Sequence, residues 1–187
     1  MAAPELKAAG FNSLVAVLRD MVPPRDFEAF VDGLPKPCAA LIREPALAVS
    51  WVPLADVEPV FSRTFDQLFH RDPARMFELG RLQLRADMTG IYRMFLRIAS
   101  PEFVTARTAD IYRMYTRECG TMRVLADQPG RIDVLIKDRP FASSAFYHYL
   151  RGSIFGVIEL TGVKRLGVAI VDGGGDLPRC HFRITWS

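Results

Sequence analysis

Few residues in this chain are of the types that carry chemistry. It contains three cysteines and three histidines, and only Cys180 and His181 are neighbours in the sequence. Cysteine and histidine together suit a zinc ion, or a thiol nucleophile with its base. Residues 180–186 alternate between apolar and polar, however, which predicts a strand whose adjacent side chains point to opposite faces. The pair therefore cannot share one ion or proton. We predict no metal site, and a buried Cys180 in line with Phe182.

Other catalytic patterns are missing from the sequence. The glycines at 173–175 lie between two predicted strands and lack the lysine and hydroxyl residue of a phosphate-binding loop, so a flexible hairpin connection is predicted there. The G-x-S-x-G motif of serine hydrolases is absent. Nothing in the sequence places His70 or His148 beside a cysteine. We therefore predict a protein that is not an enzyme and has no cofactor.

The hydrophobic pattern changes character near residue 119. Before this point apolar residues recur at helical spacing, and we expect helices over 11–21, 24–33 and in several segments from 54 to 118. Asp72 and Ser100, each followed by proline, are predicted helix N-caps. After it we expect strands and one helix, in the order 121–127, 131–138, helix 145–161, 165–171 and 180–186. This order is typical of an α+β fold, with a helical N-terminal half packed on a C-terminal β-β-α-β-β antiparallel sheet.

Length and composition point to one domain. With 187 residues, 50% of them hydrophobic, the chain can bury one substantial core. We expect a single domain over 1–187, made of N-terminal helices with a proline-rich connection (1–53), a helical layer (54–118) and the sheet unit (119–187). No apolar run reaches the roughly 20 residues of a membrane helix, and the N-terminus lacks the apolar core of a secretory signal. Three widely separated cysteines suit reduced thiols, so a cytoplasmic protein is expected.

Two short segments of the helical layer repeat one pattern. Residues 91–97 and 111–117 each combine isoleucine, methionine and aromatic residues with two arginines spaced i,i+4. One interpretation is two helices packed on the same core. The other is an adaptable apolar pocket lined by Tyr92, Met94, Tyr112 and Met114.

Positive charge gathers in the middle of the chain. The net charge is only +3, but eleven arginines lie between residues 63 and 123, against seven acidic residues. Such a surface can face an acidic partner, a phosphate or a membrane surface. The sequence carries neither the aromatic stacking signature of an RNA-recognition module nor zinc-finger spacing, so nucleic-acid binding is disfavoured.

Gly152 and Gly156 lie four residues apart in the predicted helix before the final hairpin. Residues this small let a helix approach the sheet closely, or let the tail of a ligand reach the backbone, and we favour packing. His148, Arg151 and Glu159 fall along one edge of the same helix, as a polar cluster or as a solvated face.

The C-terminal part of the chain resembles a known family. The helix end G-x-x-x-G-V-I-E-L-T-G, the closing strand C-x-F-x-I-x-W and the β-β-α-β-β order are similar to the 4-vinyl-reductase-type domain. That ligand-binding fold is shared with subunits of the TRAPP trafficking complex and is distantly akin to bacterial haem–nitric-oxide sensors. The segment F-D-Q-L-F-H-R-D-P-A-R-M-F-E-L-G-R is similar to an uncharacterised paralogous family of myxobacterial proteins. The resemblance covers residues 61–187.

The resemblance implies a domain that binds small hydrophobic molecules or other proteins, often as a homodimer and without catalysis. Relatives that bind zinc use several cysteines and acids near the C-terminus, where this chain has Cys180 alone. The haem sensors need a proximal histidine and a Y-x-S-x-R motif. The motif is absent here, so haem is not expected, and His148 is the histidine that the sequence leaves open.

Together these patterns predict a non-enzymatic cytoplasmic sensor or adaptor domain. Its apolar cavity would lie between the helices at 91 and 111 and the sheet, with Tyr92, Arg113, Tyr149 and His148 as polar anchors. The residues expected to contact a small hydrophobic ligand are Tyr92, Phe95, Tyr112, Tyr115, Phe146, Tyr149 and Phe155. The alternative is a protein-interaction scaffold whose cavity is simply core. Its partner would bind an arginine-bearing face, composed of Arg81, Arg85, Arg93, Arg97, Arg113 and Arg117.

Overall fold

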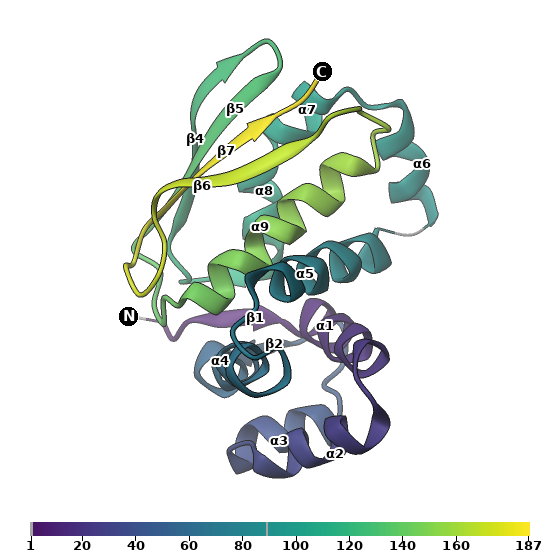
Figure 1. Ribbon diagram of the computed structural model, residues 1–187, viewed down its shortest axis with the longest axis vertical. Coiled ribbons are helices and arrows are strands. Elements are labelled where there is room, and N and C mark those ends of the chain that lie inside the picture. The colour runs from purple at the N-terminus through teal and green to yellow at the C-terminus, as the bar shows by residue number, and fades with distance from the viewer. Residues whose placement is uncertain (1, 89) are drawn as a thin grey trace.

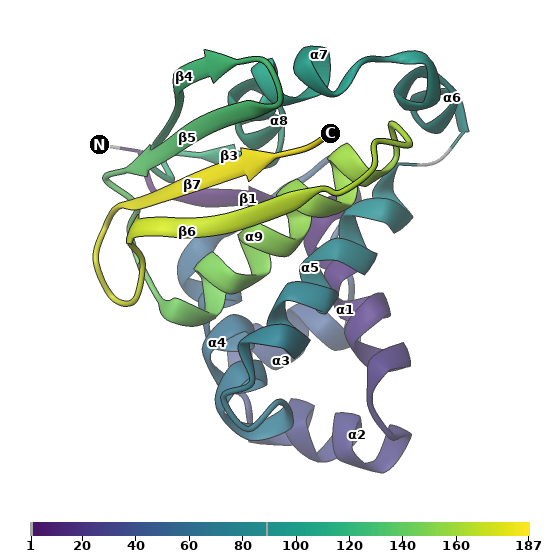
Figure 2. The same cartoon turned by 45° about the horizontal axis from the view of Figure 1, so that its top comes forward.

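Helices and one antiparallel sheet form the layers of the molecule (Figure 1). The computed structural model describes residues 2–88 and 90–187, and of residues 90–93, 126 and 127 it describes the backbone alone. Helix α9 (Ser144–Glu159) lies between the four-stranded sheet and helix α5 (Pro73–Asp87), as Figure 2 shows from a second direction. The fold is therefore α+β with an antiparallel sheet in its C-terminal part, as the sequence predicts.

The N-terminal half is helical. Its elements, besides α5, are α1 (Ala8–Met21), α2 (Pro24–Gly33), α3 (Lys36–Arg43), α4 (Leu54–Arg63), the π-helix η1 (Thr64–Leu68), α6 (Gly90–Ile98), α7 (Pro101–Ala106) and α8 (Thr108–Tyr115). Helix α5 begins as predicted, because the Asp72 carboxylate accepts a hydrogen bond from Ala74 N at 2.8 Å. Ser100 caps α7 in the same way, through Phe103 N at 3.2 Å. Helix α3 is a difference from the prediction, because no helix was expected between residue 33 and residue 54.

The larger sheet has the spatial order β4-β5-β7-β6, with all neighbours antiparallel. Its strands are β4 (Thr121–Gln128), β5 (Arg131–Lys137), β6 (Gly167–Gly173) and β7 (Cys180–Thr185). Strand β7 alternates as predicted: Cys180, Phe182 and Ile184 are buried, whereas His181 and Arg183 stay partly exposed. The alternation therefore decides which face of the sheet meets α9.

A second, smaller sheet joins three segments that are distant in sequence. Strand β1 (Glu5–Lys7) lies between β2 (Trp51–Pro53) and β3 (Thr116–Arg117) and pairs with both in antiparallel register. This sheet was not predicted, because strands of two or three residues are too short to show an alternation. This sheet brings the N-terminus beside α8.

Helices α5 and α9 cross in very close contact. A Cβ atom added at Gly152 of α9 would lie 1.8 Å from Phe77 O of α5, and one added at Gly80 of α5 would lie 2.0 Å from Tyr149 O. Gly156 faces the same helix, with a backbone oxygen 2.6 Å from its would-be Cβ. The glycines therefore serve packing as predicted, but the partner is another helix rather than the sheet.

Basic side chains surround the Asp133 carboxylate on the face of β5 that points away from α9. Its buried carboxylate accepts hydrogen bonds from Arg131 at 2.7 Å and from Arg183 of β7 at 3.1 Å, and His181 Nε2 lies 3.5 Å away. The hydrogen bonds from Arg131 and Arg183 hold the pKa of Asp133 far below its usual value.

Replacing Asp133 by asparagine should lower the free energy of unfolding by about 2 kcal/mol at neutral pH, because hydrogen bonds to a charged group are lost. Since the folded-state pKa lies below the unfolded-state value of about 3.9, this stabilisation is complete above that value and is lost as the pH falls toward the lowered pKa. Urea unfolding of both proteins between about pH 7 and pH 2.5 measures the difference, which should shrink below about pH 4. A difference that stays constant over this range contradicts the assignment; the exposed Asp176→Asn serves as the control.

Candidate functional site

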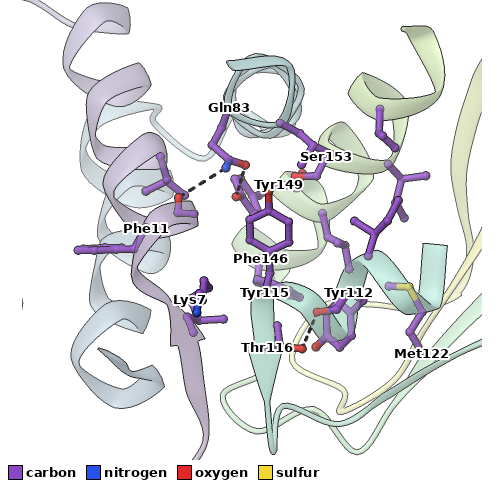
Figure 3. A pocket seen from close by; sticks show the side chains of 18 of the residues that line it. Lys7, Phe11, Gln83, Tyr112, Tyr115, Thr116, Met122, Phe146, Tyr149 and Ser153 are labelled. Carbon is purple, nitrogen blue, oxygen red and sulfur yellow. Dashed lines mark hydrogen bonds between the residues drawn. The ribbon is translucent and has the colours of Figure 1, made fainter. Parts of the chain in front are cut away.

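A cavity of about 100 Å³, partly open to the surface, lies in the described part of the chain. Figure 3 shows most of the side chains that line it; the lining residues come mainly from β1, α1, α5, α8 and α9. Helix α4 and strand β4 add Val57, Phe61 and Met122, and the wall is almost entirely apolar. The walls come from segments far apart in sequence, which the small sheet and the α5–α9 crossing bring together.

Four of the predicted ligand-contacting residues converge on this cavity. Tyr112 and Tyr115 line it from α8, and Phe146 and Tyr149 line it from α9. Phe61 of α4 completes the aromatic cluster, with its ring centroid 5.7 Å from that of Phe146 and 5.0 Å from that of Tyr149. The site therefore has one face built from aromatic rings packed edge to face.

The other three predicted residues do not join them. Phe95 on α6 is half exposed and packs against Phe103, with ring centroids 5.7 Å apart. Phe155 packs against Phe77 of α5 at 5.3 Å, because it lies on a different side of α9 from the cavity-lining residues. The Tyr92 side chain lies outside the described residues. The cavity is thus displaced from its expected place: α1 and α5 supply the wall that was assigned to the helix at residue 91.

Gln83 is a polar residue in the cavity wall. Its amide is 2% exposed; Oε1 accepts a hydrogen bond from Tyr149 OH at 2.8 Å, and Nε2 donates to the Asp87 carboxylate. Burial raises the pKa of Asp87 and raises the pKa of the Tyr149 hydroxyl far above its usual value. The polar groups are therefore satisfied by one another.

A second polar contact lies behind the aromatic face. The Tyr112 hydroxyl donates to Cys119 O at 2.7 Å and accepts from Arg139 Nη1 at 3.1 Å. The guanidinium of Arg139, 2% exposed, lies over the Phe146 ring with its Cζ 3.3 Å from the centroid. This contact is a buried cation–π interaction that fixes the position of two wall residues.

Sequence reasoning missed the side of the cavity formed by α1 and α5. Phe11 and Leu14 belong to an apolar helical stripe, which predicts burial but not a cavity. Gln83 carried a usable signal, because it falls at helical spacing from Met76, Leu79 and Gly80, on the buried side of α5. A buried polar residue needs a partner, and here the partners mark one end of the site.

Most of the arginine-bearing face is occupied by partners within the chain. Arg81 and Arg85 both bind Glu159, each at 2.7 Å, so of the predicted polar edge of α9 only Glu159 joins a salt-bridge network with α5. Arg151 lies instead over the Phe77 ring. Arg113 pairs with Asp110, and Arg117 lies 3.8 Å from Glu5 and over the Trp51 ring. Arg97 is exposed on α6, and the Arg93 side chain lies outside the described residues.

The remaining chemistry-bearing side chains lie away from the cavity. Cys38, Cys119 and Cys180 are buried, and burial raises the pKa of the Cys180 thiol to about 12 and that of Cys38 to about 11. His148 packs against Phe65, with ring centroids 6.2 Å apart, and does not line the cavity. Among the described residues there is no group of three histidine, cysteine or acidic side chains placed to hold a metal ion. Nor does any helix in the described ranges have the length and apolar character to cross a membrane.

Comparison with solved structures finds one fold repeatedly. A structure from a study of haem distortion in the H-NOX family superimposes with a TM-score of 0.71 at 12% identity, covering 97% of this chain and 95% of the other. An H-NOX protein from S. oneidensis in the Fe(II)NO ligation state gives a TM-score of 0.69 at 10% identity, covering 97% and 99%. An oxygen-binding H-NOX domain related to soluble guanylate cyclases, in its oxygen complex, gives 0.66 at 12% identity, covering 97% and 95%. At these identities the likeness is one of fold. No protein-family model matches the sequence, and a comparison with curated proteins finds no match.

These structures correct the predicted resemblance. The chain has the fold of H-NOX domains over nearly its whole length, not that of the 4-vinyl-reductase-type domain or the TRAPP subunits. The motifs behind the prediction consisted of glycines, apolar spacing and one cysteine in the C-terminal part. The structure shows that these residues serve helix packing and burial in the sheet, which many folds require.

Proposed function

We propose that the protein is a non-enzymatic sensor or adaptor domain that binds a small hydrophobic ligand in the cavity described above. The observation that carries the proposal is the apolar cavity itself, with aromatic rings on one face and few polar groups, of which Gln83 is one. Binding sites for small molecules are typically concave and apolar with few polar groups. The H-NOX fold supports the proposal, because structures with this fold include an oxygen complex and an Fe(II)NO state.

The position of the cavity suggests how binding would be sensed. Its walls belong to the N-terminal strand and helix, to α5, and to α8 and α9. A molecule bound there would contact all of these at once and stabilise their present arrangement relative to any other. A cytoplasmic partner would then distinguish the filled from the empty protein by the arrangement of these helices. We favour this over the scaffold alternative, because four of the six arginines of the arginine-bearing face form ion pairs within the chain.

A native mass spectrum of the purified protein, followed by denaturation and extraction with organic solvent, tests the proposal. We expect either a copurifying apolar molecule or, for the empty protein, a higher melting temperature with small apolar probes. Ile154→Phe, which adds bulk to the cavity wall, should abolish the effect, whereas Ile98→Phe at a position 83% exposed should not. If no molecule copurifies and no probe shifts the melting temperature, the protein does not use this cavity for binding.

A further inference from the structure

The volume of the cavity limits what it can hold. It measures about 100 Å³, whereas pockets for drug-sized ligands measure about 300–1,000 Å³. Haem, the group that the H-NOX fold implies, contains four pyrrole rings and needs a pocket of at least this size. An apolar cavity of about 150 Å³ lined by leucine, isoleucine and phenylalanine stays dry and binds benzene or xenon. The volume therefore suits a single small ring and not a macrocycle.

The wall also lacks a side chain suited to haem iron. All three histidines and all three cysteines of the chain are described, and none of the six lines the cavity. His148 shares helix α9 with Phe146 and Tyr149, but its ring packs against Phe65 instead. Met122 does line the cavity, yet methionine binds haem iron in company with a histidine.

Tyrosine is the remaining side chain that binds haem iron, and the tyrosines of the wall are poorly suited to bind it. An iron-bound tyrosine is a phenolate, so its hydroxyl must lose its proton. Three tyrosines line the wall, and each is hydrogen bonded within the protein. Tyr112 OH donates to Cys119 O at 2.7 Å, Tyr149 OH donates to Gln83 Oε1 at 2.8 Å, and Tyr115 hydrogen bonds with the Asp87 carboxylate. Burial raises the pKa of the Tyr112 and Tyr149 hydroxyls, which disfavours the phenolate. The residues on this wall therefore do not fit haem.

The other polar groups of the wall are bonded to the protein. Gln83 Nε2 donates to Asp87, whose carboxylate also hydrogen bonds with Tyr115. The remaining hydroxyls each donate to a backbone carbonyl oxygen, namely Thr108 (2.6 Å), Thr116 (2.8 Å) and Ser153 (3.2 Å). A hydroxyl or carboxylate on a ligand would have to break one of these bonds or stay unpaired, and either is costly in an apolar site.

Lys7 is the one cation on the wall, and it is engaged at the surface. Its ammonium donates to Val49 O at 2.7 Å in an exposed position and lies 4.6 Å from the centre of the Trp51 ring. Solvent and these two partners already satisfy it. The wall therefore favours a neutral ligand over an anionic one.

We infer that the cavity binds, without haem, a neutral apolar molecule of about the size of one six-membered ring that carries no hydrogen-bonding group. The inference rests on the proposed function and names the ligand class for that same cavity. It combines the cavity volume, the absence of histidine and cysteine from the wall, and the internal hydrogen bonding of the lining residues.

A ligand series tests the inference on the full chain. Benzene and cyclohexane, each at about tenfold excess over the dissociation constant, should raise the melting temperature by about 3 °C or more. Phenol should bind at least about tenfold more weakly than benzene, because its hydroxyl finds no free partner. Decanoate should give no shift. Haemin should give no stoichiometric complex with a sharp Soret band, and metal-free protoporphyrin IX should give no binding.

Matched variants locate the binding. Ile154→Phe should weaken benzene binding at least about tenfold, whereas Ile98→Phe should leave it unchanged, because only the former narrows the cavity. Val157→Ile adds a single methylene to the wall and serves as the second variant if Ile154→Phe does not fold. Stoichiometric haemin binding, or decanoate binding tighter than benzene, overturns the inference while leaving a ligand-binding cavity in place. If none of the compounds binds, the proposed function falls as well.

Discussion

Gly152→Ala should lower the free energy of unfolding by about 3 kcal/mol or more, the largest effect we expect of any single methyl group in this protein. The new Cβ would lie 1.8 Å from Phe77 O and 2.7 Å from Phe77 C, both backbone atoms of α5. A side chain can rotate away from such an overlap, but a helix backbone cannot. Helices α5 and α9 would have to separate, and wall residues of the cavity belong to both helices. Urea or thermal unfolding followed by circular dichroism measures the loss.

Gly33→Ala is the matched control. It is the same substitution at the end of a helix, and its Cβ would meet only Arg63 Nη1 at 3.9 Å. We expect a change within about 0.5 kcal/mol. If Gly152→Ala proved as stable as Gly33→Ala, the crossing of α5 and α9 would have to be looser than the structure shows. Benzene binding by Gly152→Ala, if it folds, would further report whether the cavity survives when the helices separate.

The sequence was sufficient for features that depend on local chemistry. Asp72 and Ser100 each precede a proline, and both cap helices as predicted because an N-cap needs only its own next few residues. The alternation of β7 likewise predicted that Cys180 and His181 point apart, and Cys180 is buried whereas His181 stays partly exposed. The sheet of β1, β2 and β3 was not predicted, since its pairing depends on contacts between segments more than forty residues apart.

Only part of the candidate site could be predicted from the sequence. Tyr112 and Phe146 could be selected because they are large aromatics on amphipathic helices, and both line the cavity. Phe95 and Phe155 satisfy the same criterion and lie elsewhere, because periodicity identifies an apolar face without saying what that face meets. The opposite wall depends on how α1 and α5 approach α8 and α9. Between α5 and α9 that approach is set by backbone contacts, and the sign of it in the sequence is the glycines Gly80, Gly152 and Gly156.

Gln83→Leu should lower the free energy of unfolding by about 2 kcal/mol, because it removes the acceptor of the Tyr149 hydroxyl and one of the donors to Asp87. Tyr149 OH would lose its acceptor, and Asp87, whose pKa burial already raises, would lose a donor. Tyr149→Phe alone should cost less, since only Gln83 Oε1 loses a bond. Urea unfolding of the two single variants and the double variant gives the coupling energy directly.

The double variant tests whether Gln83 and Tyr149 are each other's hydrogen-bond partners or whether each has another partner. If Gln83 and Tyr149 satisfy each other, Gln83→Leu combined with Tyr149→Phe should cost about 1 kcal/mol less than the sum of the single variants, because the second change removes a group that the first left unpaired. The exposed Gln67→Leu should change stability by no more than about 0.5 kcal/mol and controls for the substitution itself. Strict additivity would mean that each group has another partner, such as water in the cavity. A wet cavity would bind phenol as well as benzene, so the coupling energy measured without ligand also predicts the order of ligand affinities.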